Sequence, residues 1–181
     1  MVSALRSLQG IRPRLGARVH VDPAAVVIGD VELADDVSIW PTAVLRGDVG
    51  AIRIGRASNI QDGAIIHVTH DGPWSPGGGD TEIGEGVTVG HGVVIHAARI
   101  EDHCLIGIRA TILDGAIIHR HAIIAAGSLV PPGKVVGEGE LWMGQPARRV
   151  RALEPAEIER LHYSAEHYVR IKDRYLAESR D

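Results

Sequence analysis

IEDHCLIGIRATILDGAIIHRHAIIAAGSLV, residues Ile100–Val130, is the stretch that decides the fold. Within it an aliphatic residue returns at every sixth position, at Ile100, Ile106, Ile112, Ile118, Ile124 and Val130. This period matches neither the 3.6-residue repeat of an α-helix nor the simple alternation of a lone strand. It predicts short strands joined by sharp corners, each turning one aliphatic side chain inward, with three six-residue strands in every coil of a solenoid.

Three further runs extend the repeat towards the N-terminus. They comprise Val21, Val27, Leu33, Ile39 and Leu45, then Ile54, Ile60 and Ile66, then Ile83, Val89 and Ile95. An ordinary sandwich of short strands is the alternative, but four runs in one frame favour an all-β domain of parallel coils over residues 1–150.

Two segments depart from the period of six. Residues 68–80, VTHDGPWSPGGGD, are rich in Pro and Gly and are expected to form an inserted, exposed loop. After Pro155, apolar residues fall on helical spacing among charges, so residues 151–181 are expected to form a C-terminal helical segment packed alongside the solenoid.

Composition and charge argue against nucleic-acid binding and membrane association, and they suggest a compartment. The 181 residues carry a net charge of −4, which gives no electrostatic basis for binding nucleic acid. No apolar run approaches the length of a membrane span or a signal peptide, so no membrane association is expected. Cys104 is the single cysteine, which is compatible with a reducing compartment, and we predict a cytoplasmic protein.

Three histidines stand at informative places in this frame. His67 directly follows Ile66, and His96 directly follows Ile95. Their separation of 29 residues equals one 18-residue coil plus 11, close to the length of the inserted loop, so the two should stack on adjacent coils. His91 lies five residues before His96, or about 16 Å along an extended chain. A homotrimer would complete a three-histidine site by bringing His91 of one chain beside the His67–His96 pair of the next.

Four polar residues are aligned with these histidines. We call a set of equivalent positions on successive coils a column. Arg46 follows Leu45 in the His67–His96 column, whereas Asp62 lies one coil before His91. We therefore expect Arg46 to face Asp62 of the neighbouring subunit, since guanidinium and carboxylate pair in a fixed orientation. Gln61 and Asp48 share this neighbourhood. A single such residue is more often a solvated corner, but four of them aligned with the histidine columns indicate a site.

The segments VLRGDVGAIRIG, NIQDGAIIH, IGEGVTVGHGVVIHAARI, MGQPARRVR and HYVRIKDRYL resemble the gamma-class carbonic anhydrases. The resemblance, from about Val21 to about Leu176, implies a left-handed parallel β-helix. It implies a homotrimer whose His67 and His96 share a metal with His91 of the next subunit. The metal would be zinc, with iron or cobalt possible since imidazole suits several metals. CO2 would be hydrated reversibly to bicarbonate through a metal-bound hydroxide. Family site positions match Arg46, Asp48, Gln61, Asp62 and Tyr168.

Departures from the family pattern keep other functions open. Val49 stands where the family has a glutamate, and no glutamate occurs between His67 and Glu82 to carry protons. His70 is the candidate for that role, since a histidine titrates near pH 6.5. The alternatives are a hexapeptide acyltransferase or thioesterase acting on acyl-CoA, and a catalytically silent metal-stabilised trimer. The other histidines, namely His20, His103, His119, His121, His162 and His167, are expected at the surface.

Overall fold

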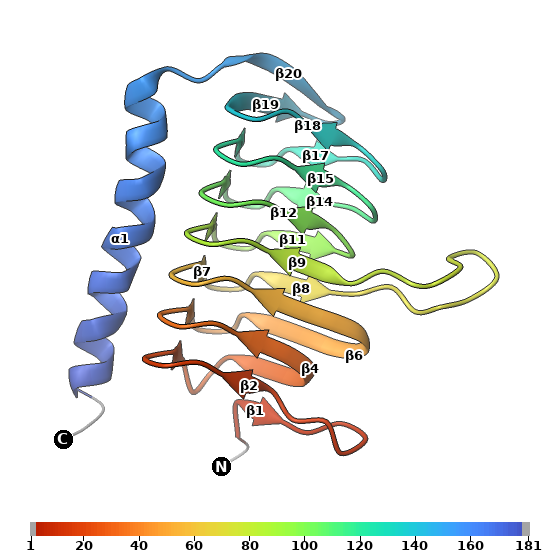
Figure 1. Cartoon of the computed structure of the whole chain (residues 1–181), viewed down its shortest axis with the longest axis vertical. Helices are drawn as coiled ribbons and strands as arrows, with labels where there is room; N and C mark the ends of the chain where they lie inside the picture. The colour runs from red at the N-terminus through yellow and green to blue at the C-terminus, as the bar shows by residue number, and fades with distance from the viewer. Residues whose placement is uncertain (1–2, 179–181) are drawn as a thin grey trace.

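The chain winds into a parallel β-solenoid with a single long α-helix alongside (Figure 1). The computed structural model describes residues 3–178. The ends of the two predicted segments, residues 1–2 and 179–181, lie outside the described residues. The predicted all-β architecture of stacked coils with a C-terminal helix is confirmed.

Each coil contributes strands to three faces. Face 1 contains β1 (Leu5–Arg6), β8 (Ile65–His67), β11 (Val94–His96), β14 (Thr111–Ile112) and β17 (Leu129–Val130). Face 2 contains β2 (Arg14–Leu15), β9 (Thr81–Ile83), β12 (Arg99–Ile100), β15 (Ile117–Ile118) and β18 (Val135–Val136). The long strands β4 (Val26–Leu33) and β6 (Val44–Ile54) bend through both faces and join them into one sheet.

Face 3 forms a separate sheet. It contains β3 (His20–Val21), β5 (Ser38–Ile39), β7 (Asn59–Ile60), β10 (Thr88–Val89), β13 (Leu105–Ile106), β16 (Ile123–Ile124) and β19 (Glu140–Gly144). The antiparallel strand β20 (Ala147–Ala152) follows and ends the sheet.

The core consists of the repeat positions themselves. From Val27 to Val130, each aliphatic repeat residue is at most 3% exposed. The register pairs equivalent repeat residues of adjacent coils: Ile66 pairs with Ile95, and Ile95 pairs with Ile112. Because coils are about 4.8 Å apart, each inward position meets its equivalent in the next coil, which suits branched aliphatic side chains. Val21 is only partly buried and packs against the end of this core.

Helix α1 (Pro155–Glu178) covers face 3 and contacts β3, β5 and β10. Trp40 packs edge-on against Tyr168 and Tyr175 of the helix, with ring centroids 5.8 and 5.1 Å apart. His20, 6% exposed, lies between Trp40 and Tyr175, so its expected surface position is wrong: the helix covers it. Among the described residues, no helix has the length and apolar character needed to cross a membrane.

A buried ion pair fixes the C-terminal half of α1 to the solenoid. The side chain of Lys172 is 0% exposed, and its Nζ lies 2.9 Å from Oδ1 of Asp36, whose side chain is 10% exposed. Asp173 also pairs with this ammonium, and Arg18 donates from Nε to Asp36 at 2.9 Å. The hydrogen bond from Arg18, helped by Lys172, holds the pKa of Asp36 below its ordinary value despite partial burial. The helix therefore has a defined position along the coils.

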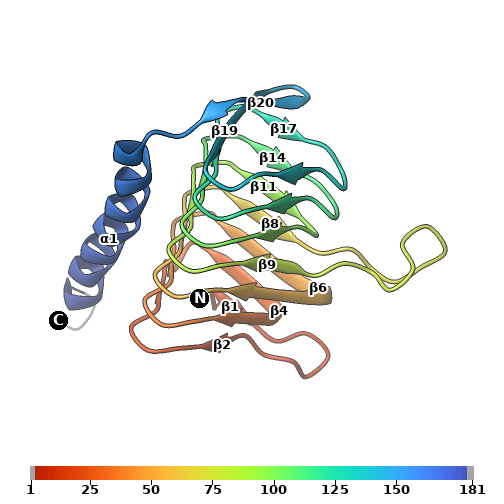
Figure 2. The ribbon, with the colours of Figure 1, turned by 45° about the horizontal axis from the view of Figure 1, so that its top comes forward.

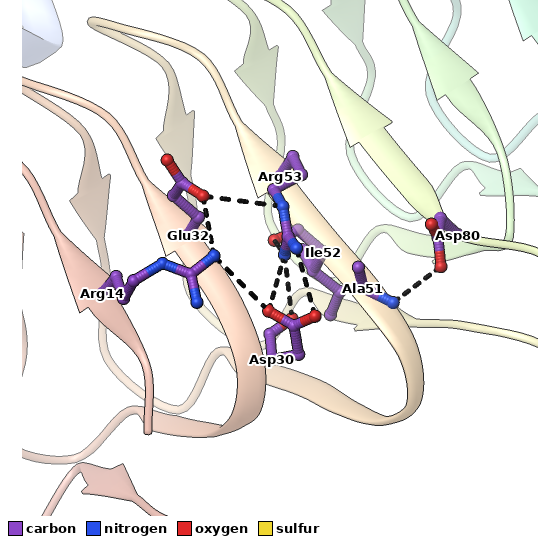
Figure 3. Close-up of polar contacts among 7 residues, drawn as sticks. All are labelled: Arg14, Asp30, Glu32, Ala51, Ile52, Arg53 and Asp80. Atoms are coloured by element: carbon purple, nitrogen blue, oxygen red, sulfur yellow. Dashed lines mark hydrogen bonds and ion pairs between the residues drawn. The ribbon is translucent and has the colours of Figure 1, made fainter. Parts of the chain in front are cut away.

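An arginine network fixes the bend shared by β4 and β6 (Figure 3). Arg53 donates from Nη1 and Nη2 to both carboxylate oxygens of Asp30, at 2.9 and 3.1 Å. Arg14 donates to Glu32 at 2.9 Å, and Glu32 lies 3.6 Å from Arg53. Asp80, at the end of residues 68–80, accepts a hydrogen bond from the amide of Ala51 at 2.7 Å. The bend of β6 is thus tied both to the preceding coil and to the segment after β8.

Residues 68–80 form a hairpin that projects from the solenoid on the side away from α1 (Figures 1 and 2). Backbone hydrogen bonds at 2.9 Å join Thr69 and Gly79 in both directions, and further bonds join Gly72 and Ser75. The hydroxyl of Ser75 donates to the carbonyl of His70 at 2.6 Å. The hairpin is therefore internally hydrogen-bonded along its length.

Candidate metal centre

Two histidines from adjacent coils face each other on face 1. His67 of β8 and His96 of β11 are in direct register, one coil apart. Nδ1 of His67 lies 3.0 Å from Nε2 of His96, and the ring centroids are 5.0 Å apart. This is the stacking that the repeat frame predicts. Each ring thus presents one nitrogen to the same small volume.

A carboxylate holds the other nitrogen of each ring. Asp48 Oδ1 lies 2.9 Å from Nε2 of His67, and Asp114 Oδ1 lies 2.8 Å from Nδ1 of His96. Arg46 pairs with Asp48, and the hydroxyl of Thr69 donates to Asp114. We call these six residues the paired-histidine half.

Both carboxylates are held ionised by their partners. Partial burial opposes ionisation of Asp48, but hydrogen bonds from His67 and Arg46 keep its pKa below the ordinary value. Partial burial likewise opposes ionisation of Asp114, and hydrogen bonds from Thr69 and His96 lower its pKa. Ionised carboxylates of this kind orient imidazoles and raise their basicity towards a metal.

The third histidine lies at another corner of the coil. Nδ1 of His91 lies 3.0 Å from Oδ2 of Asp62, and both side chains are 49% exposed. Gln61, 5% exposed, donates from Nε2 to Oδ1 of Asn59 at 3.1 Å. Tyr168 of helix α1 packs against Trp40, whose amide donates to the carbonyl of Ile60 beside Gln61, so it lies at the same corner; burial, and to a lesser degree the Asp62 carboxylate, raise its pKa. Gln61, Asp62, His91 and Tyr168 form what we call the lone-histidine half.

The two halves are separate within one chain. Across residues 3–178, no group of three or more His, Cys, Asp or Glu side chains is arranged to hold a metal ion. Arg46 pairs with Asp48 and Asp62 with His91, so the two residues expected to pair between subunits each have a partner in their own chain. His70 is exposed on the hairpin.

Sequence reasoning missed Asp114 and Thr69. Asp114 follows Ile112 by two residues, and Ile112 pairs in register with Ile95, so extending the same frame by one more coil would have found it. Thr69 had no comparable signal, because it belongs to the inserted hairpin, whose path the repeat does not determine.

A further histidine cluster lies where α1 meets the opposite corner, and its three members, expected at the surface, are half-buried there. The rings of His103 and His162 lie 4.1 Å apart, those of His121 and His162 5.4 Å, and those of His103 and His121 5.8 Å. We call these three the corner histidine cluster. Burial, then the neighbouring imidazoles, lower the pKa of His103, and burial and His162 lower that of His121. The charged groups facing them are Glu85, Asp102, Arg120 and Glu138.

Comparison with known proteins places the chain in a family of hexapeptide-repeat proteins. A family model described as Bacterial transferase hexapeptide (six repeats) matches residues 97–132. Protein YrdA of Escherichia coli (strain K12) is 47% identical over 97% of this chain and 96% of its own. Gamma carbonic anhydrase 2, mitochondrial, of Arabidopsis thaliana is 41% identical over 92% of this chain, which spans 60% of that protein's length.

A solved structure shares the fold of this chain. The crystal structure of a hexapeptide transferase family protein from Anaplasma phagocytophilum is 36% identical, with a TM-score of 0.89. The match covers 97% of this chain and 99% of that one. Both the solenoid and the helix therefore fall within the similarity.

Proposed function

Because the chain belongs to the gamma-class carbonic anhydrase family of hexapeptide-repeat proteins, we propose that it hydrates CO2 reversibly to bicarbonate at a metal site shared between subunits. The observation that carries this proposal is the carboxylate behind each of three imidazoles: Asp48 behind His67, Asp114 behind His96 and Asp62 behind His91. This pairing leaves one nitrogen of each ring available to a metal.

The donor set fits zinc. Three neutral imidazoles with an open fourth position are a catalytic zinc arrangement. The facing nitrogens of His67 and His96, 3.0 Å apart, are close to the separation of about 3.3 Å expected for two nitrogens at zinc-ligand distance in a tetrahedron. Iron and cobalt share the preference for imidazole, so the donor set also suits these metals. When bound, zinc lowers the pKa of a coordinated water to near 7.

A second subunit completes the site in this proposal. His91 is half-exposed at a corner away from the pair, so its free nitrogen is accessible to another chain. In a homotrimer each paired-histidine half would meet the lone-histidine half of a neighbour, giving three equivalent sites. Arg46 would then lie near Asp62 of that neighbour, and the two would tie the subunits together at the base of the site.

The remaining residues would orient the reactants and move the proton. The buried Gln61 amide is fixed by its bond to Asn59, which leaves one N–H and the carbonyl oxygen to position CO2 or water. Asp48 bonds His67 and Arg46, so its part is to position His67 rather than to meet substrate. Tyr168 borders the same space, and His70 on the exposed hairpin would pass protons to solvent.

The test is a stopped-flow CO2 hydration assay on protein loaded separately with zinc, iron and cobalt. We expect metal-dependent hydration, and we expect His96→Ala to abolish both the bound metal and the rate. Glu82→Gln, on face 2, is the matched control and should leave both unchanged. Normal metal content in His96→Ala would refute the ligand assignment.

Acyl transfer from acyl-CoA is the second candidate, supported by the 36% identity to the solved hexapeptide transferase family protein. It would use a histidine as a base and would not require metal. Turnover of acyl-CoA by metal-free protein, with no CO2 hydration by loaded protein, would favour it. Stoichiometric metal with neither activity would indicate a metal-stabilised scaffold.

For the compartment we propose the cytoplasm, which is supported by a lone buried thiol, Cys104, whose pKa burial raises to about 12.

A further inference from the structure

An apolar groove begins at the lone-histidine half. It has a volume of about 380 Å³ and runs from Gln61 and His91 between α1 and face 3. Leu105, Ile108 and Ile123 line it along the next two coils. Ile108 is 51% exposed there and lies next to the other apolar side chains of the groove, so it belongs to a contiguous apolar patch and is not an isolated surface residue. The groove is therefore an apolar surface that the chain itself does not cover.

The hairpin presents the complementary feature. Trp74, near its tip, is 98% exposed. The hairpin is held by its own backbone hydrogen bonds, and Asp71 additionally accepts from the amide of Gly77 at 2.7 Å. A large aromatic side chain exposed on an ordered hairpin is typical of an interface anchor, because little conformational entropy of the backbone is lost when it binds.

The two features flank the two halves of the proposed site. The hairpin starts at the residue after His67, whereas the groove starts at His91. If His91 of one chain meets His67 of the next, the hairpin of the second chain emerges beside the groove of the first. From Val68 to Trp74 the hairpin can reach about 20 Å, and the groove extends only about 10 Å over two coils.

We propose that Trp74 of each protomer inserts into the groove beside His91 of its neighbour, so that a second copy of this chain supplies the outer wall of the site. This inference rests on the proposed shared site. An indole buries 150–250 Å² and needs one acceptor for its N–H. The groove offers apolar walls together with the hydroxyls of Thr88 and Ser164, which lie 3.1 Å apart.

The first test uses the fluorescence of Trp74. Trp40 and Trp142 are 5% and 7% exposed, so Trp74 dominates the acrylamide-accessible emission. In assembled protein we expect blue-shifted emission and quenching several-fold weaker than in Ile108→Glu, which places a carboxylate in the groove. Val135→Glu is the matched control, since Val135 is also 51% exposed but lies on face 2.

The second test is a crosslink. Chains carrying Trp74→Cys mixed with chains carrying Ile108→Cys should form an interchain disulfide, whereas Val135→Cys chains should not. Trimers by sedimentation in which Trp74 quenches as freely as in Ile108→Glu would overturn this inference and leave the proposed function standing. Monomers in the presence of metal would instead refute the shared site, and the inference with it.

Discussion

The pair formed by Lys172 and Asp36 gives the sharpest stability prediction. Asp36→Asn removes the carboxylate that lies 2.9 Å from the Lys172 ammonium, while the shape of the side chain is kept. The ammonium then stays 0% exposed, with only the carboxylate of Asp173, whose side chain is 53% exposed. An uncompensated buried charge is the expected cause of destabilisation.

The magnitude follows from the burial of the two partners. Removing one member of a buried pair costs about 3–5 kcal/mol. Asp173 remains beside the ammonium, so we expect the lower end, about 3 kcal/mol. The lost contact with Arg18, whose side chain is 58% exposed, adds at most about 1 kcal/mol. Lys172→Met should cost less, because Arg18 still pairs with Asp36. The double variant should be less damaged than the sum of the singles.

Urea denaturation followed by far-UV circular dichroism measures these differences, with Glu159→Gln on the exposed face of α1 as the control. The pKa of Asp36 is depressed in the folded state, so its contribution is present above the unfolded value of 3.8 and is lost as the pH falls through the folded pKa. Asp36→Asn should therefore lessen acid sensitivity. A free energy of unfolding within about 0.5 kcal/mol of wild type would refute the reasoning, since ordinary surface changes have that effect.

Three further predictions concern the site and the helix. Asp114→Asn should weaken metal binding by roughly 10–100-fold by chelator competition, with Glu82→Gln unchanged, because Asp114 orients His96. Within the corner histidine cluster, His103 and His121 have lowered pKa values in the folded state, so stability should fall as the pH drops below about 6.5, where the unfolded chain binds more protons. His162→Gln should flatten that dependence in unfolding midpoints. In metal-free protein, Arg46→Ala or Asp62→Ala should weaken the trimer by sedimentation, and strict additivity in the double variant would contradict an intersubunit pair.

The repeat alone was enough to predict the core and the main stacking. A period of six fixes which side chain turns inward, and the register then follows from counting, so the sequence alone predicts His67 beside His96 and Asp62 beside His91. These arguments succeed because coil spacing and strand direction in a solenoid leave little freedom.

What could not be predicted depends on contacts outside the repeat. Helix α1 packs through Trp40 and Lys172, and helical spacing alone does not say which face of the solenoid it covers or that it buries His20. The hairpin has its own hydrogen bonds, so the position of Thr69 beside Asp114 follows from local turn geometry that the sequence pattern leaves open. Pairing between side chains of the same strand was also missed, since Arg46 pairs with Asp48 of its own strand β6.

The path of helix α1 has a consequence for how the molecule unfolds. A stack of coils in which each contacts only its neighbours behaves as a one-dimensional chain and frays from its ends. Here the helix starts beside the last coil and ends beside the first ones, where Lys172 meets Asp36 (Figure 1). Opening the N-terminal coils therefore requires undocking an element anchored at the other end of the stack. The helix thus acts as a longitudinal brace, which couples the two ends and makes loss of the coils a single event.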